Sequence, residues 1–309
     1  MRYAVVLGEA LIDLLDGECD GAPVYRQVIG GAPLNVAVGV ARLGGSVEFA
    51  GSLGDDALAE RIRAFLRTAG VGDRALTTVA APTTLAVATF TGAEPDFRFY
   101  GEPPSYGQFD AAGLDDGLIS DAAVLYCGSI ALLCEPTLAA ARQAWAGTTG
   151  LRVFDPNVRP RLLPDRAALT AYRDVVAGFA ATADLVKLSA ADAEVLYDGA
   201  DPGVAAALLH DLGAGAVVVT RGAAGALVSA GGEALLIDAP KVAAVDATGA
   251  GDSVMGALIA ELLDTGLPTD AVGWAQQVGF ALRVAGLVCE SPGGAVSMPT
   301  RAAVAERFA

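Results

Sequence analysis

The chain has 309 residues, of which 53% are hydrophobic, enough to bury the core of one large domain. Its formal net charge of −16 argues against nucleic acid and anionic membranes as partners, because both attract basic proteins. The single histidine, His210, lies in a helical pattern that favours a surface position. A Ser-His-Asp or Cys-His catalytic arrangement is therefore nearly excluded, and any general base is expected to be a carboxylate.

The four cysteines show no CxxC pair and no neighbouring histidine, so neither a zinc site nor a disulfide framework is expected. Unpaired cysteines fit a reducing compartment. The N-terminus runs directly into a strand-like segment, residues 3–8, without the features of a signal peptide, and we find no transmembrane stretch. We therefore expect a soluble, cytoplasmic protein.

Asp13 follows this first strand and is surrounded by apolar residues. Open α/β sheets bind ligands just beyond the ends of their strands, which makes Asp13 a candidate binding residue. A solvent-facing acid on an alternating edge strand would give the same pattern. This segment by itself supports both interpretations equally.

A glycine pair, Gly30 and Gly31, precedes an apolar run that we expect to be helical. Pro33 suits the first turn of that helix, so Asn35 falls in the same turn, next to glycines that permit close approach of a ligand. An amide both donates and accepts hydrogen bonds and therefore suits a sugar hydroxyl. Asn early in a helix is also a common local cap.

The pattern changes between residues 75 and 100, where short strand-like runs follow one another without long helices between them. These runs, residues 75–79, 85–90 and 97–100, indicate a small sheet apart from the main body. Together with the N-terminal segment they predict a β lid over a ligand site, formed by about residues 9–29 and 80–105. Arg98, inside this lid, is either a partner for a ligand carboxylate or a surface residue.

The remaining chain alternates strand-like and helical stretches. Such alternation predicts an α/β fold with a doubly wound, mostly parallel sheet flanked by helices, and we expect residues 1–309 to form a single domain with its lid. The predicted strands are residues 47–56, 123–129, 151–155, 185–189 and 216–220.

Polar residues follow three of these strands. Because the carboxyl ends of parallel strands meet at one edge of a sheet, we expect these residues to converge on one site. They are Arg159 after the 151–155 strand, Lys187 and Asp192 at and after the 185–189 strand, and Thr220, Gly222 and Gly225 after the 216–220 strand.

The segment Gly249-Ala250-Gly251-Asp252 opens a long apolar helical stretch. The first N–H groups of a helix have no partners inside it, so they form a site for a phosphate or another anion. Asp252 at the edge of that site suits a base that takes a proton from a hydroxyl group. The alternative is a glycine-rich turn with Asp252 as a simple helix cap.

Two common nucleotide motifs are absent from the sequence. There is no GxxxxGK[ST] segment, which excludes a P-loop. Val254 stands where a dinucleotide-binding fingerprint would have its third glycine after Gly249 and Gly251, so this fingerprint fails as well.

Two other motifs carry a resemblance. Residues 30–37, Gly-Gly-Ala-Pro-Leu-Asn-Val-Ala, and residues 246–252, Asp-Ala-Thr-Gly-Ala-Gly-Asp, resemble the N- and C-terminal signatures of the ribokinase-like (PfkB) carbohydrate kinase family. Their order and their separation of more than two hundred residues make the resemblance specific. Within the family the chain looks most like bacterial fructokinases, on residues 8–13, 128–131 and 154–160.

The resemblance implies a ribokinase-like fold and an ATP-dependent sugar kinase, with fructose as the expected acceptor. Asp252 would be the base and residues 249–251 the anion hole for the γ-phosphoryl group. The remaining implied roles are sugar binding by Asp13, Gly30, Gly31 and Asn35, an approach of Arg159 to the phosphates at the substrate site, and ATP binding by Lys187, Thr220, Gly222 and Gly225. Arg98 stays a candidate substrate ligand on its position in the lid alone.

The resemblance also implies metal sites and a homodimer. The family's Asn-x-x-Glu element, tied to Mg²⁺ and phosphate, appears here as Ser189 to Asp192, one methylene shorter at its acid. Asp246, Thr248 and Ser297 would hold a monovalent cation such as K⁺, and lids of two subunits would pair. The alternatives are 2-keto-3-deoxygluconate, ribose or a nucleoside as acceptor, or a catalytically silent sugar-binding regulator.

Overall fold

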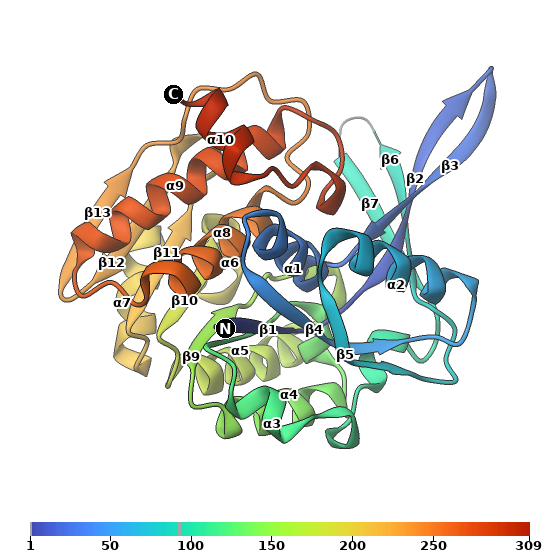
Figure 1. The fold of residues 1–309 in the computed structure, drawn as a ribbon, viewed down its shortest axis with the longest axis horizontal. Coiled ribbons are helices and arrows are strands. Elements are labelled where there is room, and N and C mark those ends of the chain that lie inside the picture. The colour runs from blue at the N-terminus through green and yellow to red at the C-terminus, as the bar shows by residue number, and fades with distance from the viewer. Residues whose placement is uncertain (1, 92–93) are drawn as a thin grey trace.

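The computed structural model describes residues 2–91 and 94–309. A large sheet forms its centre (Figure 1). Its strands are β1 (Tyr3–Leu7), β4 (Ser46–Leu53), β5 (Gly72–Thr78), β8 (Val124–Gly128), β9 (Leu151–Asp155), β10 (Leu185–Ser189), β11 (Ala216–Thr220), β12 (Ala226–Ala230) and β13 (Glu233–Ile237). Their order is β13-β12-β11-β10-β9-β8-β1-β4-β5. Pairs from β11 to β5 are parallel, and β12 and β13 add antiparallel pairs at one edge.

Helices cover both faces of this sheet, which confirms the predicted doubly wound fold. One face packs against α1 (Ala32–Arg42), α2 (Ala57–Ala69), α8 (Ala250–Thr265), α9 (Ala271–Cys289) and α10 (Arg301–Arg307). The other packs against α3 (Asp116–Ser120), α4 (Thr137–Gly147), α5 (Arg166–Ala180), α6 (Ala190–Leu196) and α7 (Pro202–Leu212). The central strands are apolar on both sides because both sides are covered.

Within the described residues, six short 3₁₀ helices interrupt the connections. Those after β8, β9 and β11 bring loop residues over the carboxyl edge of the sheet. They are η1 (Ser105–Gln108), η2 (Ala111–Gly113), η3 (Ile130–Leu133), η4 (Pro160–Leu162), η5 (Gly222–Ala224) and η6 (Ala295–Ser297).

A second, four-stranded sheet lies apart from the body, as expected. Its strands are β2 (Leu11–Cys19), β3 (Ala22–Gly30), β6 (Leu85–Thr91) and β7 (Glu94–Tyr100), in the order β3-β2-β6-β7. The β2–β3 hairpin projects beyond the body in Figure 1.

The prediction that residues 75–79 belong to this small sheet was wrong. Residues 75–78 form the end of β5, which pairs in parallel with β4 at the edge of the main sheet. Periodicity identifies a strand but not its partner, and here Ala75 and Leu76 are buried by the main body.

The sheet has a switch point at β1. From β1 the chain builds β4 and β5 on one side, and β8 to β11 on the other. Loops leaving β1 and β8 therefore diverge and leave a crevice beyond the carboxyl ends of these two strands.

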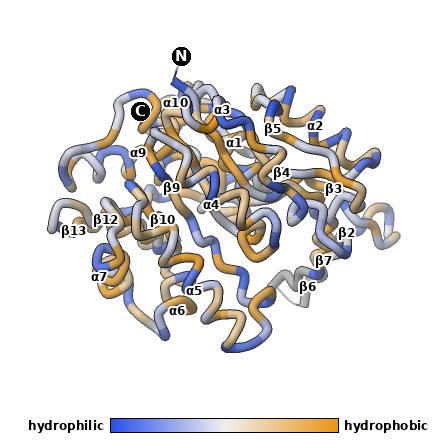
Figure 2. Tube along the Cα trace, turned by 90° about the horizontal axis from the view of Figure 1, so that it is seen from below, coloured by the Kyte–Doolittle hydropathy of each residue, from blue (hydrophilic) through white to orange (hydrophobic). Residues whose placement is uncertain are grey.

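Helices α1 and α8 pack closely over this crevice. Figure 2 shows α1 as hydrophobic along most of its length, whereas α2 alternates between hydrophobic and hydrophilic residues. Residues 32–40 of α1 are all buried, as expected for a helix inside a layered fold. The close approach depends on Gly39 and Gly256, because a Cβ on Gly256 would lie 3.0 Å from Val36 O and 3.2 Å from Gly39 Cα.

Among the described residues, no helix is both long enough and apolar enough to cross a membrane.

Replacing Gly256 with Val should separate α1 from α8, because the added methyl groups meet main-chain atoms that cannot move independently. We expect a loss of about 1–3 kcal/mol in the free energy of unfolding, the usual cost of overpacking. Gly279→Val is the matched control on α9, where a Cβ meets nothing within 4 Å. Equal stability of the two variants, measured by urea denaturation, would contradict this account of the helix contact.

Candidate active site

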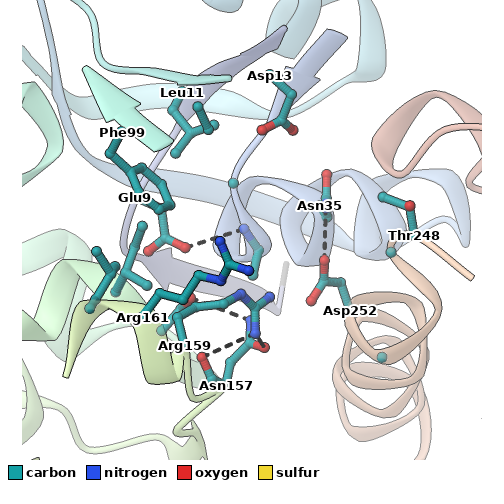
Figure 3. A pocket seen from close by; sticks show the side chains of 18 of the residues that line it. Glu9, Leu11, Asp13, Asn35, Phe99, Asn157, Arg159, Arg161, Thr248 and Asp252 are labelled. Carbon is teal, nitrogen blue, oxygen red and sulfur yellow. Dashed lines mark hydrogen bonds between the residues drawn. The ribbon is translucent and has the colours of Figure 1, made fainter. Parts of the chain in front are cut away.

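A cavity of about 510 Å³ opens at the switch point of the sheet (Figure 3). Carboxylate, amide and guanidinium groups face an apolar wall across it, an arrangement that suits a small polar molecule. The polar lining residues are Glu9, Asp13, Asn35, Ser129, Asn157, Arg159, Arg161, Thr248 and Asp252, and the apolar ones include Leu11, Ala86, Phe99, Ile130 and Leu162.

The first turn of α8 forms one side of this cavity. Gly249 precedes the helix in the left-handed region, with φ 77°, and a Cβ there would lie 2.8 Å from Gly294 Cα. Gly249, Gly251 and Asp252 line the cavity, and no side chain among the described residues caps this turn. Ala250 does not line the cavity, and its N–H donates to Ala247 O. N–H groups at the start of a helix have no partner inside it, which is the geometry that anions favour.

Asp252 is held in place by Asn35 from the neighbouring helix. Asn35 Nδ2 donates to Asp252 Oδ2 at 2.7 Å, as Figure 3 shows. Each residue lies one turn before the glycine contact of its own helix, so the packing of α1 on α8 sets this distance. Burial raises the pKa of Asp252, although the hydrogen bond from Asn35 and the charges of Lys187 and Arg159 lower it. A carboxylate with a raised pKa is a better proton acceptor near neutral pH.

Asp13 faces the cavity from β2 rather than from a loop. It pairs with Val28 of β3, and its side chain lines the cavity. The alternative of a solvent-facing acid on an edge strand does not hold, because β2 lies between β3 and β6. A Cβ on Gly30 would lie 2.0 Å from Asp13 Oδ2, which explains the glycine there. Gly31 has φ 111°, and its Cβ would lie 2.5 Å from Glu9 O. The two glycines therefore allow the chain to pass from β3 into α1 in close contact with Asp13 and Glu9.

Glu9 is a site residue that the sequence reading did not assign. Its buried carboxylate accepts from Ala32 N at 3.3 Å and from Ala131 N at 3.2 Å, joining the start of α1 to the loop after β8. Burial raises its pKa to about 7. An acid just after a strand predicts a position near the ligand site, but it does not predict these two hydrogen bonds, because Ala32 and Ala131 are distant in sequence.

Arg159 extends into the cavity from the loop after β9, and Figure 3 shows Arg161 beside it. Arg159 Nη1 donates to Asn157 Oδ1 at 2.7 Å, and Asn157 adopts a positive φ of 39°. Arg161 was missed because it lies on η4, a turn too short to show periodicity.

The structure does not place Arg98 at the cavity. Arg98 is exposed and pairs with Val87, whereas the next residue, Phe99, lines the cavity. Successive side chains of a strand point to opposite faces, so only one of these two can face the site. The cationic lining comes instead from Arg159 and Arg161.

Lys187 does not line the cavity either. Its Nζ donates to Asp155 Oδ2 at 2.6 Å, and the two side chains are 4% and 1% exposed. A direct contact with ATP does not fit this burial, so its predicted role needs correction.

Asp192 is similarly occupied by protein partners. Its Oδ2 accepts from the main chain and the hydroxyl of Ser189, which forms a capping box for α6, and its Oδ1 accepts from Val158 N at 2.8 Å. Direct coordination of a metal by Asp192 would have to compete with these bonds.

Thr220, Gly222 and Gly225 lie at the end of β11 and do not line the cavity. Gly222 has a positive φ of 56°, and a Cβ there would meet nothing within 4 Å. Gly225 has another reason to be glycine, because its Cβ would lie 1.9 Å from Ile237 O.

Asp246 and Thr248 share one turn, and the loop that carries Ser297 is bonded to it through Gly293. Asp246 Oδ1 accepts from the N–H and the hydroxyl of Thr248 at 2.8 and 2.6 Å, and its Oδ2 accepts from Gly293 N at 3.0 Å. Ser297 Oγ donates to Gly294 O at 2.9 Å. The last loop of the chain thereby packs against the segment before α8.

Comparison with known proteins identifies this arrangement. The family model described as "pfkB family carbohydrate kinase" matches residues 1–301. The chain belongs to the pfkB family of carbohydrate kinases. This carbohydrate kinase is 34% identical to Fructokinase-1 of Oryza sativa subsp. japonica, over 98% of the chain and 96% of the relative. It is also 34% identical to a fructokinase of Salmonella typhimurium, over 95% of each.

Solved structures of the same family share the fold of this kinase. A fructokinase of Xylella fastidiosa with bound ATP superposes with a TM-score of 0.88 at 27% identity, covering 99% of this chain and 98% of that one. A fructokinase of Vibrio cholerae O395 with fructose, ADP and calcium gives a TM-score of 0.88 at 26% identity, with the same coverage. The ribokinase-like fold expected from the two sequence signatures is confirmed.

Asp13 should make this kinase less stable as the pH rises. Burial raises its pKa to about 7, although Arg159 lowers it and Asp252 raises it further. Because an unfolded Asp has a pKa near 3.9, folded protein resists ionisation, and stability falls between about pH 4 and pH 7. Asp13→Asn should therefore raise Tm relative to wild type by more at pH 8 than at pH 5. A pH-independent difference in differential scanning fluorimetry would refute this.

Proposed function

We propose that this protein is an ATP-dependent fructokinase. The observation that carries the proposal is the carboxylate of Asp252 at the start of α8, hydrogen-bonded to Asn35 and facing the same cavity as Asp13. A base, an anion site and a carboxylate for hydroxyl groups thus surround one cavity. Fructose is the acceptor that the names of the related kinases favour.

The geometry supports transfer to a hydroxyl group. Asp252 accepts the hydroxyl proton as the sugar oxygen forms a bond to the γ-phosphorus of ATP. The bond from that phosphorus to the β,γ-bridging oxygen breaks, and ADP leaves with the electron pair. The N–H groups at the start of α8 receive the developing negative charge, and positioning supplies most of the remaining catalysis.

Mg²⁺ would neutralise charge on the ATP phosphates. Among residues 2–91 and 94–309, no group of three His, Cys, Asp or Glu is arranged to hold a metal ion. Asp192 keeps its protein hydrogen bonds in our proposal and approaches such an ion through water. Magnesium usually keeps several of its waters, so water and phosphate oxygens would supply its ligands.

ATP would approach along the carboxyl edge of β11, past Thr220 and the open surface of Gly222. The small sheet would close over the sugar and exclude water. The Asp246–Thr248 turn and the loop carrying Ser297 would hold a monovalent cation such as K⁺. Pairing of small sheets would form a homodimer, and the four free cysteines fit a cytoplasmic location.

A sugar acid is the second candidate acceptor. Arg159 and Arg161 both line the cavity, and guanidinium groups bind carboxylates well. For this reason 2-keto-3-deoxygluconate is an alternative acceptor, and ribose and a nucleoside are further alternatives.

The test is sugar-dependent ADP formation with Mg-ATP across fructose, ribose, 2-keto-3-deoxygluconate and adenosine. We expect fructose to give the highest kcat/KM. A higher value for the sugar acid would transfer the assignment to the second candidate. Sugar binding by calorimetry without ADP formation from any acceptor would favour a silent regulator.

Asp252→Asn should lower kcat by about 10²–10⁴-fold, the usual effect of removing a general base. The amide keeps the size of the side chain, so sugar binding should be largely retained. Thermal unfolding of the variant checks that the fold is intact. Turnover close to that of wild type in a folded variant would remove Asp252 from the proposed mechanism.

A further inference from the structure

A buried ion pair lies outside the cavity, in the interior of the main sheet. Lys187 on β10 and Asp155 on β9 meet at 2.6 Å, with only 4% and 1% of their side chains exposed. Burying two charges costs solvation energy that the attraction between them offsets only in part. Stability alone is therefore a weak reason for placing an ion pair here.

The pair lies directly behind the anion site. Val153 and Leu185 face the helix layer that contains α8, and Asp155 and Lys187, each two residues further along a strand, point the same way. Lys187 Nζ lies 3.3 Å from where a Cβ on Gly251 would be. The ammonium group therefore lies next to Gly251 in the first turn of α8 and does not line the cavity.

The two charges of the pair lie next to different parts of the fold. Asp155 is also tied to the loop after β9, because its Oδ1 accepts from Asn157 N at 3.0 Å. The positive end, Lys187, is the end that approaches α8. It reinforces the positive end of the helix dipole where a transferring phosphoryl group would lie.

We propose that Lys187 is a positioning residue, whose buried ammonium group adds positive charge behind the first turn of α8 and holds Asp252 in its ionised form. The partner Asp155 limits this effect, because it balances the charge. The proposal rests on the role of Asp252 as base in the proposed function. It replaces the expected contact between Lys187 and ATP with an action through the helix.

The electrostatics of the surrounding groups agree with this role. The charge of Lys187 lowers the pKa of Asp252, against the larger effect of burial. Although burial lowers the pKa of Lys187, its acidic neighbours raise it above the ordinary value, so it stays protonated. The ionisable groups that act on Asp252 or are affected by it are Asp13, Tyr126, Asp155, Arg159, Lys187 and Asp192.

Single substitutions of the two partners should shift the ionisation of Asp252 in opposite directions. Lys187→Met removes the positive charge, so the acid limb of the rate profile should move up by about one pH unit. Asp155→Asn leaves the ammonium unbalanced, so the limb should move down. The readout is the single-turnover rate between pH 5 and 9 at saturating sugar and Mg-ATP, which reports ionisation in the enzyme–substrate complex.

Two further variants separate this effect from damage to the fold. Arg173→Met breaks an ion pair with Asp198 on the surface and should leave the acid limb unchanged. The double variant Lys187→Met/Asp155→Asn removes both buried charges and should have a Tm above that of either single variant, with its acid limb between theirs. Tm is measured for every variant by calorimetry.

Opposite shifts of the limb in the two folded single variants would support the proposal. The same acid limb in all active variants, with only Tm and maximal rate reduced, would show that the pair is structural and overturn it. A wild-type protein without any sugar-dependent phosphoryl transfer would instead overturn the proposed function, and this inference with it.

Discussion

The close contact between α1 and α8 is the constraint on which the site depends. The contact exists because Gly39 and Gly256 have no side chains, so the two helices approach to main-chain distance. Asn35 and Asp252 each lie one turn before that contact, and their hydrogen bond is a consequence of it. Two segments more than two hundred residues apart in the sequence thus meet at one cavity. A small change in helix spacing would directly change the hydrogen bond that holds Asp252, since hydrogen bonds weaken steeply away from their preferred geometry.

The site concentrates charges that destabilise the folded protein when it is empty. Burial raises the pKa of Glu9 and of Asp13 to about 7. The two carboxylates differ in their partners, however. Glu9 accepts hydrogen bonds from two main-chain N–H groups and joins separate segments, whereas Asp13 faces the cavity. The first therefore shapes the site and the second is placed to meet a ligand. Unfavourable burial of charge at a binding site is a common relation between function and stability.

The cavity is lined by two kinds of segment, the main body on one side and the small sheet with a loop on the other. Asp252 and the first turn of α8 belong to the main body, in the helix layer that packs on one face of the sheet. Asp13 and Phe99 come from the small sheet, and Arg159 and Arg161 from a loop. Such loops and edge strands change without disturbing the core, so acceptor specificity can vary within a family that keeps one reaction.

The sequence by itself determined the fold class, the main strands and the two signature segments, because local periodicity and glycine-rich turns are properties of neighbouring residues. It also placed Asp252 and Asn35 at the starts of their helices. Tertiary structure decided which residues share the cavity. Glu9 and Arg161 line it, Arg98 points away, and Lys187 is buried in an ion pair with Asp155. The strand at residues 72–78 joined the main sheet for the same reason. Which face a strand residue takes, and which partner it meets, depends on the packing of segments distant in sequence, and no local pattern records that choice.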